Sequence, residues 1–485
     1  MHAELPNEVD VVLIGGGLAG LTCAVVLAER GVRVAVLERD RRLGGRAQSY
    51  RDQQTADPVH LGPHILLSAY PNMRALLRRL GTEDRIRWMD ERFISLVEGT
   101  SCYPVTSDPR LPPPLHFLPS FRVAPGLSRR DLLSNARVVW TALRLGASEL
   151  AALDDEIALS WLRRMGVTEA AIERSWSFIA LSILNVPLEL CSAGALLRFF
   201  RRLIGHNDIR IGLPTCGLGD LFAPQAEALL RARQSVAATD VTVQSILTDG
   251  PRAVGVRLAD GRTIKARWVV STVPPANLRP LIPEAWQSAR IFTDLVHFVP
   301  CPYISTCLWF DGKLSDHAFW ARLPAPGDFN CDFYDLSNLP PGWPTDRSII
   351  TSNIIWSHRA AELTDAQIIA QTRRELAEFL PAAATTPLRH AVVHRIPLAV
   401  HCPFPGIERR RPDPVTPFAG LLVAGDWVKT GVPASMEGAC RSGHLAAQAI
   451  LESRGEPVKL VHDVPEFTGI SRLIVEVSRA LRHAP

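Results

Sequence analysis

The chain has 485 residues, with 53 Lys and Arg against 49 Asp and Glu, and 47% of its residues are hydrophobic. This composition supports a large folded core and excludes a disordered, collagen-like or low-complexity chain. The net charge of +4 comes without a dense basic stripe interleaved with aromatic residues, so we expect no nucleic-acid partner. Nine cysteines with no CxxC pair predict free thiols in a reducing, cytoplasmic compartment, and no apolar run is long enough to span a bilayer.

The first elements predict a dinucleotide site. A β-branched run, Val9–Ile14, reads as a buried parallel strand, and an Ala- and Leu-rich helical pattern extends to about Arg30. A second strand pattern, residues 32–37, ends at the acid Glu38. The strand and the helix are joined by Gly15-Gly16-Gly17-Leu18-Ala19-Gly20, which matches GxGxxG.

Each residue of this motif has a physical role. Gly15 allows the tight turn, Gly17 lets the backbone approach a pyrophosphate, and Gly20 permits close helix–strand packing. The helix N-terminus supplies free N–H groups, and Glu38 can accept hydrogen bonds from a ribose, which argues against the 2′-phosphate of NADP. The alternative is a glycine-rich turn in an unrelated α/β unit.

Three later segments resemble the flavin amine oxidase and phytoene desaturase superfamily. They are the paired glycines before Arg46, the strand ending in Gly425-Asp426, and the helix that starts near Met436. The resemblance implies FAD bound non-covalently, with Gly425-Asp426 near the ribitol and phosphate and the helix N-terminus near the flavin pyrimidine. A β-meander pattern in residues 241–275 places Val241 near the adenine, with Val243 as an alternative.

The cofactor-contacting residues follow from the motif and from the resemblance together. We expect them to be Gly15, Gly17, Leu18, Ala19, Gly20, Glu38, Arg39, Gly44, Gly45, Arg46, Gly62, Pro63, His64, Ile65, Val241, Gly425, Asp426, Val432, Met436 and Ala439.

The expected fold is α/β, with a Rossmann-like FAD-binding domain assembled from discontinuous segments and an α+β substrate domain that has a helical part. The FAD-binding segments are residues 1–85, 211–290 and 396–455. The substrate segments are 86–210 and 291–395, and 456–485 forms an amphipathic tail.

The resemblance implies a long apolar isoprenoid substrate and hydride transfer at flavin N5. Residues 426–439 and the stretch from Trp176 to Pro187 resemble hydroxysqualene dehydroxylases, which makes squalene formation our main prediction. The segments Gly62–Ile65 and Ala69–Asn72 are closer to plant-type phytoene desaturases, the first alternative, for which a quinone is a candidate electron partner. A flavin amine oxidase is the second alternative, although of the lysines only Lys313 is a candidate for the residue that many such oxidases place near N5.

Two segments are candidates for contact with the inner face of a membrane. Residues 104–125 form a Pro-rich, apolar stretch with neighbouring arginines, and an ordinary packed loop is the alternative. In the tail, docking of a helix on the protein's own body is favoured over insertion; its apolar face comprises Ile470, Leu473, Ile474, Val477 and Leu481.

No catalytic dyad can be identified from the pattern. His64, in the segment expected against the flavin, and Asn185, before a turn at Pro187, are the catalytic candidates. Each has a structural alternative, either packing or turn capping. His60 is a weaker candidate, and Glu437 is expected to be structural. No His or Cys spacing supports a metal site.

Overall fold

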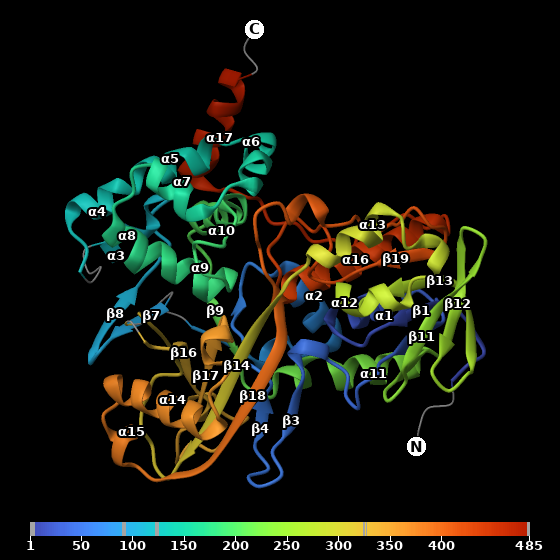
Figure 1. Cartoon of the computed structure of the whole chain (residues 1–485), viewed down its shortest axis with the longest axis horizontal. Helices are drawn as coiled ribbons and strands as arrows, with labels where there is room; N and C mark the ends of the chain where they lie inside the picture. Colours follow the sequence, from blue (N-terminus) through green and yellow to red (C-terminus); the bar gives the residue numbers. More distant parts are fainter. Residues whose placement is uncertain (1–4, 90–93, 122–125, 324, 326, 483–485) are drawn as a thin grey trace.

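The computed structural model describes residues 5–89, 94–121, 126–323, 325 and 327–482. The chain forms an α/β unit at one end, a second sheet at the other, and a helical region above that second sheet (Figure 1). None of the helices in these residues has the length and hydropathy needed to cross a bilayer.

The α/β unit is built on a mostly parallel sheet in the order β10-β2-β1-β13-β12-β11, with β19 also pairing with β13. Its strands come from three distant parts of the chain. They are β1 (Glu8–Ile14), β2 (Val34–Leu37), β10 (Val236–Ala238), β11 (Val243–Asp249), β12 (Arg252–Leu258), β13 (Thr263–Ser271) and β19 (Leu421–Val423).

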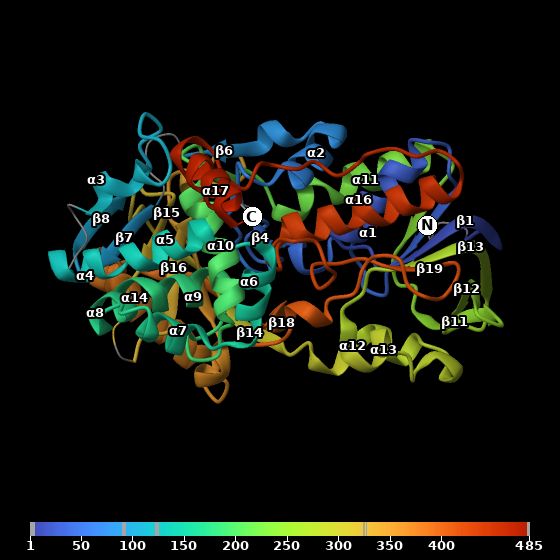
Figure 2. The same cartoon turned by 90° about the horizontal axis from the view of Figure 1, so that it is seen from above.

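Both faces of this sheet are covered, which explains the continuous apolar run of β1. Val11 and Leu13 belong to the core beneath one layer of helices, and Val12 and Ile14 to the core on the opposite face. The first layer contains α1 (Leu18–Ala28), α2 (Pro71–Leu80), α11 (Ala223–Ala232) and α16 (Met436–Ser453), and the second contains α12 (Pro275–Leu278) and α13 (Arg290–Thr293) (Figure 2).

The second sheet runs in the order β18-β14-β17-β16-β15-β7-β8 and is antiparallel except for the β15–β7 pair. Residues before position 106 and after position 299 therefore meet in one sheet. Helix α14 (Asp365–Phe379) packs against this sheet, and α15 (Ala382–Thr385) packs against α14. Its strands are β7 (Ile94–Glu98), β8 (Ser101–Val105), β14 (Pro300–Phe310), β15 (Phe319–Arg322), β16 (Asn330–Asp335), β17 (Ile349–Ile355) and β18 (Leu388–His401).

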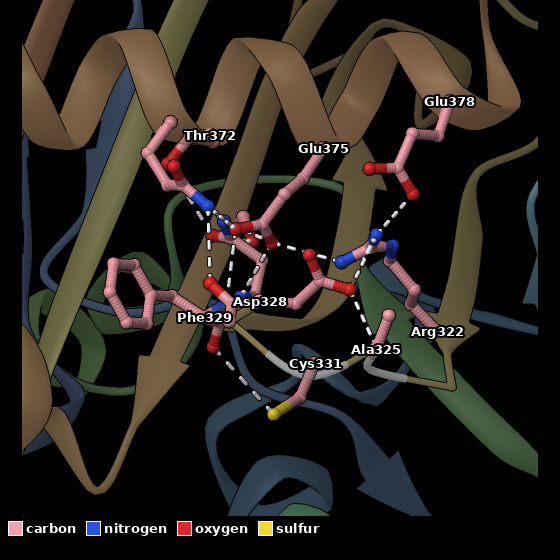
Figure 3. Close-up of polar contacts among 12 residues, drawn as sticks. Arg322, Ala325, Asp328, Phe329, Cys331, Thr372, Glu375 and Glu378 are labelled. Atoms are coloured by element: carbon pink, nitrogen blue, oxygen red, sulfur yellow. Dashed lines mark hydrogen bonds and ion pairs between the residues drawn. The ribbon is translucent and has the colours of Figure 1, made fainter.

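A buried charge cluster fastens the β15–β16 connection to α14 (Figure 3). Arg322 is within 2.8 Å of Asp328 and 3.0 Å of Glu375, and it also pairs with Glu378. Glu375, which has no exposed side-chain surface, accepts a further hydrogen bond of 2.9 Å from the Asn330 N–H. The first residue of β16 is thereby held in place from the helix side.

The helical region comprises α4 (Arg129–Ser134), α5 (Ala136–Arg144), α6 (Ala147–Ala152), α7 (Ala158–Arg164), α8 (Glu169–Ala171), α9 (Ser177–Leu184), α10 (Ala193–Gly205) and α17 (Gly469–Arg482). Small sheets join the two main units. They are β3 (Ser49–Arg51) with β4 (Pro58–His60), and β5 (Leu66–Leu67) with β9 (Ile211–Pro214) and β6 (Ile86–Trp88).

The Pro-rich stretch 104–125 is not structureless where it is described. It completes β8 and forms a 3₁₀ turn, Leu115–Phe117, followed by the short helix α3 (Leu118–Phe121). Residues 122–125 of this stretch lie outside the described residues.

The C-terminal helix α17 docks on α5 and α10 through only part of the predicted apolar face. Its buried positions are Ser471, Val475 and Ser478, and Ser471 donates a hydrogen bond of 3.0 Å to the Ile204 carbonyl. Leu473 and Val477 instead expose 60% and 57% of their surface. Of the predicted apolar face, Leu473 and Val477 therefore face outward, whereas Ile474 is half-buried and packs on the helical core. The side chain of Leu481 lies outside the described residues.

Candidate active site

The glycine turn after β1 has the geometry that its motif predicts. Gly15 has φ +106 and donates a hydrogen bond of 2.8 Å to the Leu37 carbonyl. A Cβ at Gly20 would lie 2.2 Å from the Gly15 oxygen, so only glycine allows α1 to approach the turn this closely. At Gly17 the nearest atom to a Cβ would be the Gly45 Cα at 3.9 Å, which leaves open space beside the turn.

The N-terminus of α1 is available as an anion site. Its N-cap, Gly17, supplies no side-chain hydrogen bond, so the first N–H groups of the helix are free to bind a phosphate. Glu38 borders the same turn; its carboxylate accepts hydrogen bonds of 2.7 Å from the Gly16 N–H and 3.0 Å from the Asp40 N–H. The Val241 N–H binds the Glu38 carbonyl at 2.9 Å, which brings the third chain segment to this edge.

An ion pair joins the two ends of the chain at this site. Arg46 binds Asp426 through both guanidinium arms, at 2.6 and 3.0 Å, and donates a further bond of 3.1 Å to the Ala399 carbonyl. Burial opposes ionisation of Asp426, but the Arg46 guanidinium more than compensates and lowers the pKa of that carboxyl below its usual value. Asp426 therefore stays ionised at neutral pH.

Helix α16 begins beside this ion pair. Ser435 caps it by accepting a hydrogen bond of 3.1 Å from the Gly438 N–H, and Met436 and Ala439 line the adjacent cavity. Glu437 turns away from the cavity and accepts hydrogen bonds from the Asn72 and Met73 N–H groups, both at 3.0 Å. Glu437 therefore caps the N-terminus of α2, in agreement with its expected structural role.

One cavity of about 1480 Å³ runs from the glycine turn into the substrate region. It exceeds the roughly 300–1,000 Å³ of a pocket for one drug-sized ligand, so a dinucleotide and a second large molecule can share it. We call the glycine turn, Glu38, the Arg46–Asp426 pair and the N-terminus of α16 the cradle. Beyond the cradle, the cavity wall is largely apolar and is formed by the helical region and the second sheet. Typical lining residues are Leu143, Ile179, Phe200, Leu203, Phe319 and Ile355.

Most of the residues expected to contact the cofactor line this single cavity. Those that line it are Gly15, Gly17, Leu18, Ala19, Glu38, Arg39, Gly44, Gly45, Arg46, Gly62, Pro63, His64, Ile65, Val241, Gly425, Asp426, Met436 and Ala439. Gly20 packs behind the turn, and Val432 lies in a small neighbouring pocket instead.

The two catalytic candidates also reach the cavity. The His64 Nδ1 is 2.8 Å from the Gly62 carbonyl oxygen, and burial lowers the pKa of His64, so the neutral ring donates this bond. Asn185 ends α9 in the left-handed region, at φ 70, and its Oδ1 accepts a hydrogen bond from the Tyr303 hydroxyl. His60 does not line the cavity; its Nδ1 accepts a bond of 3.1 Å from the Leu218 N–H.

The strands of the second sheet add polar residues that the sequence pattern did not reveal. Asp332, Tyr334 and Asn353 line the cavity from β16 and β17, next to the Gly62–Ile65 segment. Nothing in the local sequence marks them, because their proximity depends on the pairing of β16 with β17.

Lysine is missing from the described cavity wall. Lys313 donates hydrogen bonds of 2.6 Å to Ser337 and to Asn338, away from the cavity. Among the described residues, no cluster of three or more His, Cys, Asp or Glu is arranged to hold a metal ion.

Residues 18–451 match the family model of flavin containing amine oxidoreductases. A 15-cis-phytoene desaturase of Synechococcus elongatus is 29% identical over 92% of this chain and 96% of its own length. A 15-cis-phytoene desaturase of Solanum lycopersicum is 28% identical (92% and 78%), and a probable zeta-carotene desaturase of S. elongatus is 24% identical (92% and 99%).

Solved structures share the fold at low sequence identity. A putrescine oxidase bound to putrescine aligns with a TM-score of 0.70 at 16% identity, covering 92% of this chain and 99% of that one. A cyclohexylamine oxidase from Brevibacterium oxydans aligns with a TM-score of 0.68 at 21% identity, covering 93% and 100%. At these identities the likeness extends to the fold alone.

Proposed function

The chain belongs to the flavin containing amine oxidoreductase family, and from this premise we propose that it is a desaturase of a long isoprenoid polyene of the phytoene type. It is an oxidoreductase whose cofactor is FAD. The observation that carries the proposal is the continuity of the glycine cradle with a large, mostly apolar chamber.

The cradle fits FAD on three observations. The N-terminus of α1 is uncapped, the space beside Gly17 is open, and Arg46 with Asp426 closes the same cavity from the other end of the chain. In this assignment α1 binds the pyrophosphate, Glu38 the ribose, and the N-terminus of α16 the flavin pyrimidine. When bound, FAD supplies an acceptor for two electrons and a proton, in the form of hydride.

The apolar chamber suits a hydrocarbon substrate. Such a molecule offers few polar handles, so its binding comes from buried area, at about 25 cal/mol per Å². The chamber also excludes water from the reacting carbons. The amine oxidase alternative has less support, because the described lysines lie away from the cavity and the structural neighbours show the fold alone.

The curated relatives favour desaturation over the dehydroxylation suggested by the sequence resemblance. Their names are those of phytoene and zeta-carotene desaturases, and they align over nine-tenths of this chain. A quinone, which is itself lipid-soluble, is the class of electron acceptor that we propose for the reduced enzyme.

An assay with three arms separates these alternatives. The holoenzyme is given phytoene in liposomes with a benzoquinone; separately, reduced holoenzyme is given hydroxysqualene, and oxidised holoenzyme is given putrescine. We expect a longer conjugated polyene by chromatography in the first arm alone. Squalene in the second arm or hydrogen peroxide in the third, with no polyene in the first, contradicts the proposal.

We also propose that the protein binds a membrane surface at the opening of the cavity. Four large apolar residues between positions 115 and 140 both line the cavity and are exposed, and we assign the membrane-facing opening to this group: Leu115 (40% exposed), Leu118 (47%), Leu133 (73%) and Trp140 (51%). The outward face of α17 adds Leu473 and Val477, and Ile474 of this helix lines the cavity.

The surroundings of this opening suit an anionic lipid surface. Arg110, Arg129, Arg130 and Arg137 are exposed near the apolar residues, and a substrate dissolved in the bilayer would enter the cavity without crossing water. Of the predicted patch, the side chain of Phe121 and the whole of Arg122 lie outside the described residues.

Flotation with vesicles of phosphatidylcholine and phosphatidylglycerol tests this surface. Because burial of each leucine is worth about 1.5–3 kcal/mol, we expect L133D/L473D to bind about 10²–10⁴-fold more weakly. The matched control is V296D, which changes an exposed residue (53%) outside the cavity lining. Equal flotation of the double variant and the wild type contradicts the proposed surface.

A further inference from the structure

The cavity wall contains a carboxylate that the cofactor cradle does not use. From β16 the cavity is lined by Cys331, Asp332 and Tyr334, whereas Phe333 and Asp335 do not line it. Among the described cavity-lining residues, the other carboxylates are Glu38, Asp40 and Asp426, and all of these lie around the cradle.

Asp332 is held by hydrogen bonds from two neighbouring groups. The Tyr334 hydroxyl donates a bond of 2.9 Å to its Oδ2, and the Asn353 N–H donates one of 3.2 Å to its Oδ1. Within the described residues it makes no ion pair. Burial raises the pKa of Asp332 to about 6, against these two donors.

The titratable groups that face Asp332 are neutral. They are Tyr334 and Cys331 on its own strand and Tyr303 on β14, and burial, with Asp332 as a further contributor, raises the pKa of each. Asp332 is thus the group in this part of the wall that changes charge near neutral pH.

Asn353 connects the acid to the segment expected against the flavin. Its Nδ2 donates a bond of 3.3 Å to the Pro63 carbonyl, while its buried Oδ1 has no partner in the described structure. The charge cluster around Arg322 fixes the start of β16, so Asp332 is held at a set position relative to Gly62–Ile65 (Figure 3). A rigid acid beside the segment expected against the flavin is a candidate for proton exchange with a substrate bound in the cavity.

We propose that Asp332 is the general base that removes the proton during desaturation. This inference rests on the proposed function. Forming a carbon–carbon double bond removes a hydride, for which oxidised FAD is the acceptor, and a proton from the adjacent carbon. When the proton is removed, the C–H bond of the adjacent carbon breaks, its electron pair becomes the π bond, and the proton forms an O–H bond with the Asp332 carboxylate.

The neighbouring tyrosines do not serve this role. Tyr303 and Tyr334 keep their protons because burial raises the pKa of each. His64 donates from its Nδ1 to the Gly62 carbonyl, and burial lowers the pKa of its ring below the ordinary value, so it holds a proton less strongly than a free imidazole. Tyr334 is instead a positioning residue, since its hydroxyl fixes one oxygen of Asp332.

The variants D332N and D332E in the holoenzyme test the role, with D335N as the matched control. Asp335 lies on the same strand but binds Ser337 and Ser348 outside the cavity. We expect D332N to bind FAD normally and to lose about 10²–10⁴-fold in the anaerobic rate of flavin reduction by phytoene. D332E should recover part of this rate, and D335N should retain the wild-type rate.

Two further readouts distinguish a base from a structural residue. In the wild type, kcat/KM should fall tenfold per pH unit below about 6, because protonated Asp332 cannot accept a proton, and D332N should lack this limb. Without substrate, the infrared band of a protonated carboxyl should titrate near the same pH in the wild type and be absent in D332N.

The outcomes separate this inference from the function on which it rests. If no polyene reduces the flavin of the wild type, the proposed function fails and the inference fails with it. If the wild type is active and D332N matches it in rate and pH profile, or if no carboxyl band is lost in D332N, the inference alone is overturned.

Discussion

Arg46 and Asp426 link the amino-terminal and carboxy-terminal parts of the cofactor cradle. The guanidinium binds the carboxylate in a two-armed arrangement that lysine cannot reproduce, and Asp426 is only 5% exposed. Removal of one member leaves a buried charge with reduced compensation. This pair therefore joins two distant parts of the chain at the wall of the cavity that we propose holds the cofactor.

We expect R46A to lose FAD during purification and R46K to retain it partially. Lysine keeps the charge but forms only a single contact, so about tenfold weaker binding is expected for R46K and a larger loss for R46A. The ratio of flavin absorbance to protein absorbance in the purified variant measures how much FAD it retains. Arg41, whose side chain is 90% exposed, provides the control R41A. Full flavin content in R46A would contradict the assigned role.

The residues of the cradle were predictable because their role is fixed by local backbone geometry. Gly15 takes φ +106 in the turn, and the space beside Gly17 is open, which is the backbone geometry that the glycine spacing predicts for a phosphate-binding turn. Asp332 was not predictable. Its significance arises from the pairing of β16 with β17, which supplies Asn353, and from its burial without an ion-pair partner among the described residues.

At the scale of elements, the crossing of α1 with α16 sets the shape of the cradle. A Cβ at Gly443 of α16 would lie 2.4 Å from the Ala19 carbonyl oxygen of α1 and 3.2 Å from the Cys23 nitrogen. Because these are backbone atoms, they cannot move aside as a flexible side chain would. Close contact between the two helices therefore depends on glycine at this position.

G443A should destabilise the protein even though alanine is a better helix former than glycine. Overpacking costs about 1–3 kcal/mol, and alanine gains roughly 1 kcal/mol over glycine in helix propensity. Because the clash is with backbone atoms, we expect the overpacking cost to be near the upper end of its range and to exceed this gain. Thermal unfolding should show a lower Tm and earlier release of flavin fluorescence. The control E452A changes an exposed position of the same helix. An unchanged or higher Tm in G443A would show that α1 and α16 can move apart to fit the methyl group without loss of stability.

Helix α17 illustrates what amphipathic patterns leave undetermined. The spacing of Ile470, Leu473 and Val477 correctly indicates one apolar face, but a pattern does not say what covers it. Docking on α5 and α10 uses the narrower stripe of Ser471, Val475 and Ser478. The outward face then becomes part of the surface around the cavity opening.

At the scale of the whole molecule, distant segments of the chain alternate between two units. The sequence predicted this alternation for the nucleotide sheet, because each of its segments carries a recognisable strand or glycine motif. The second sheet was harder to derive, since β7 and β8 join strands that follow some 200 residues later in the chain. Long-range pairing of this kind has no local sequence signal.

Desaturation requires that bound flavin and polyene meet in one cavity, and anaerobic spectroscopy of the holoenzyme tests this directly. Phytoene in liposomes should bleach the oxidised flavin band in a single turnover, and an added benzoquinone should restore it while a longer conjugated polyene accumulates. A purified protein without flavin, or a flavin band that phytoene leaves unchanged, would contradict the proposed desaturase.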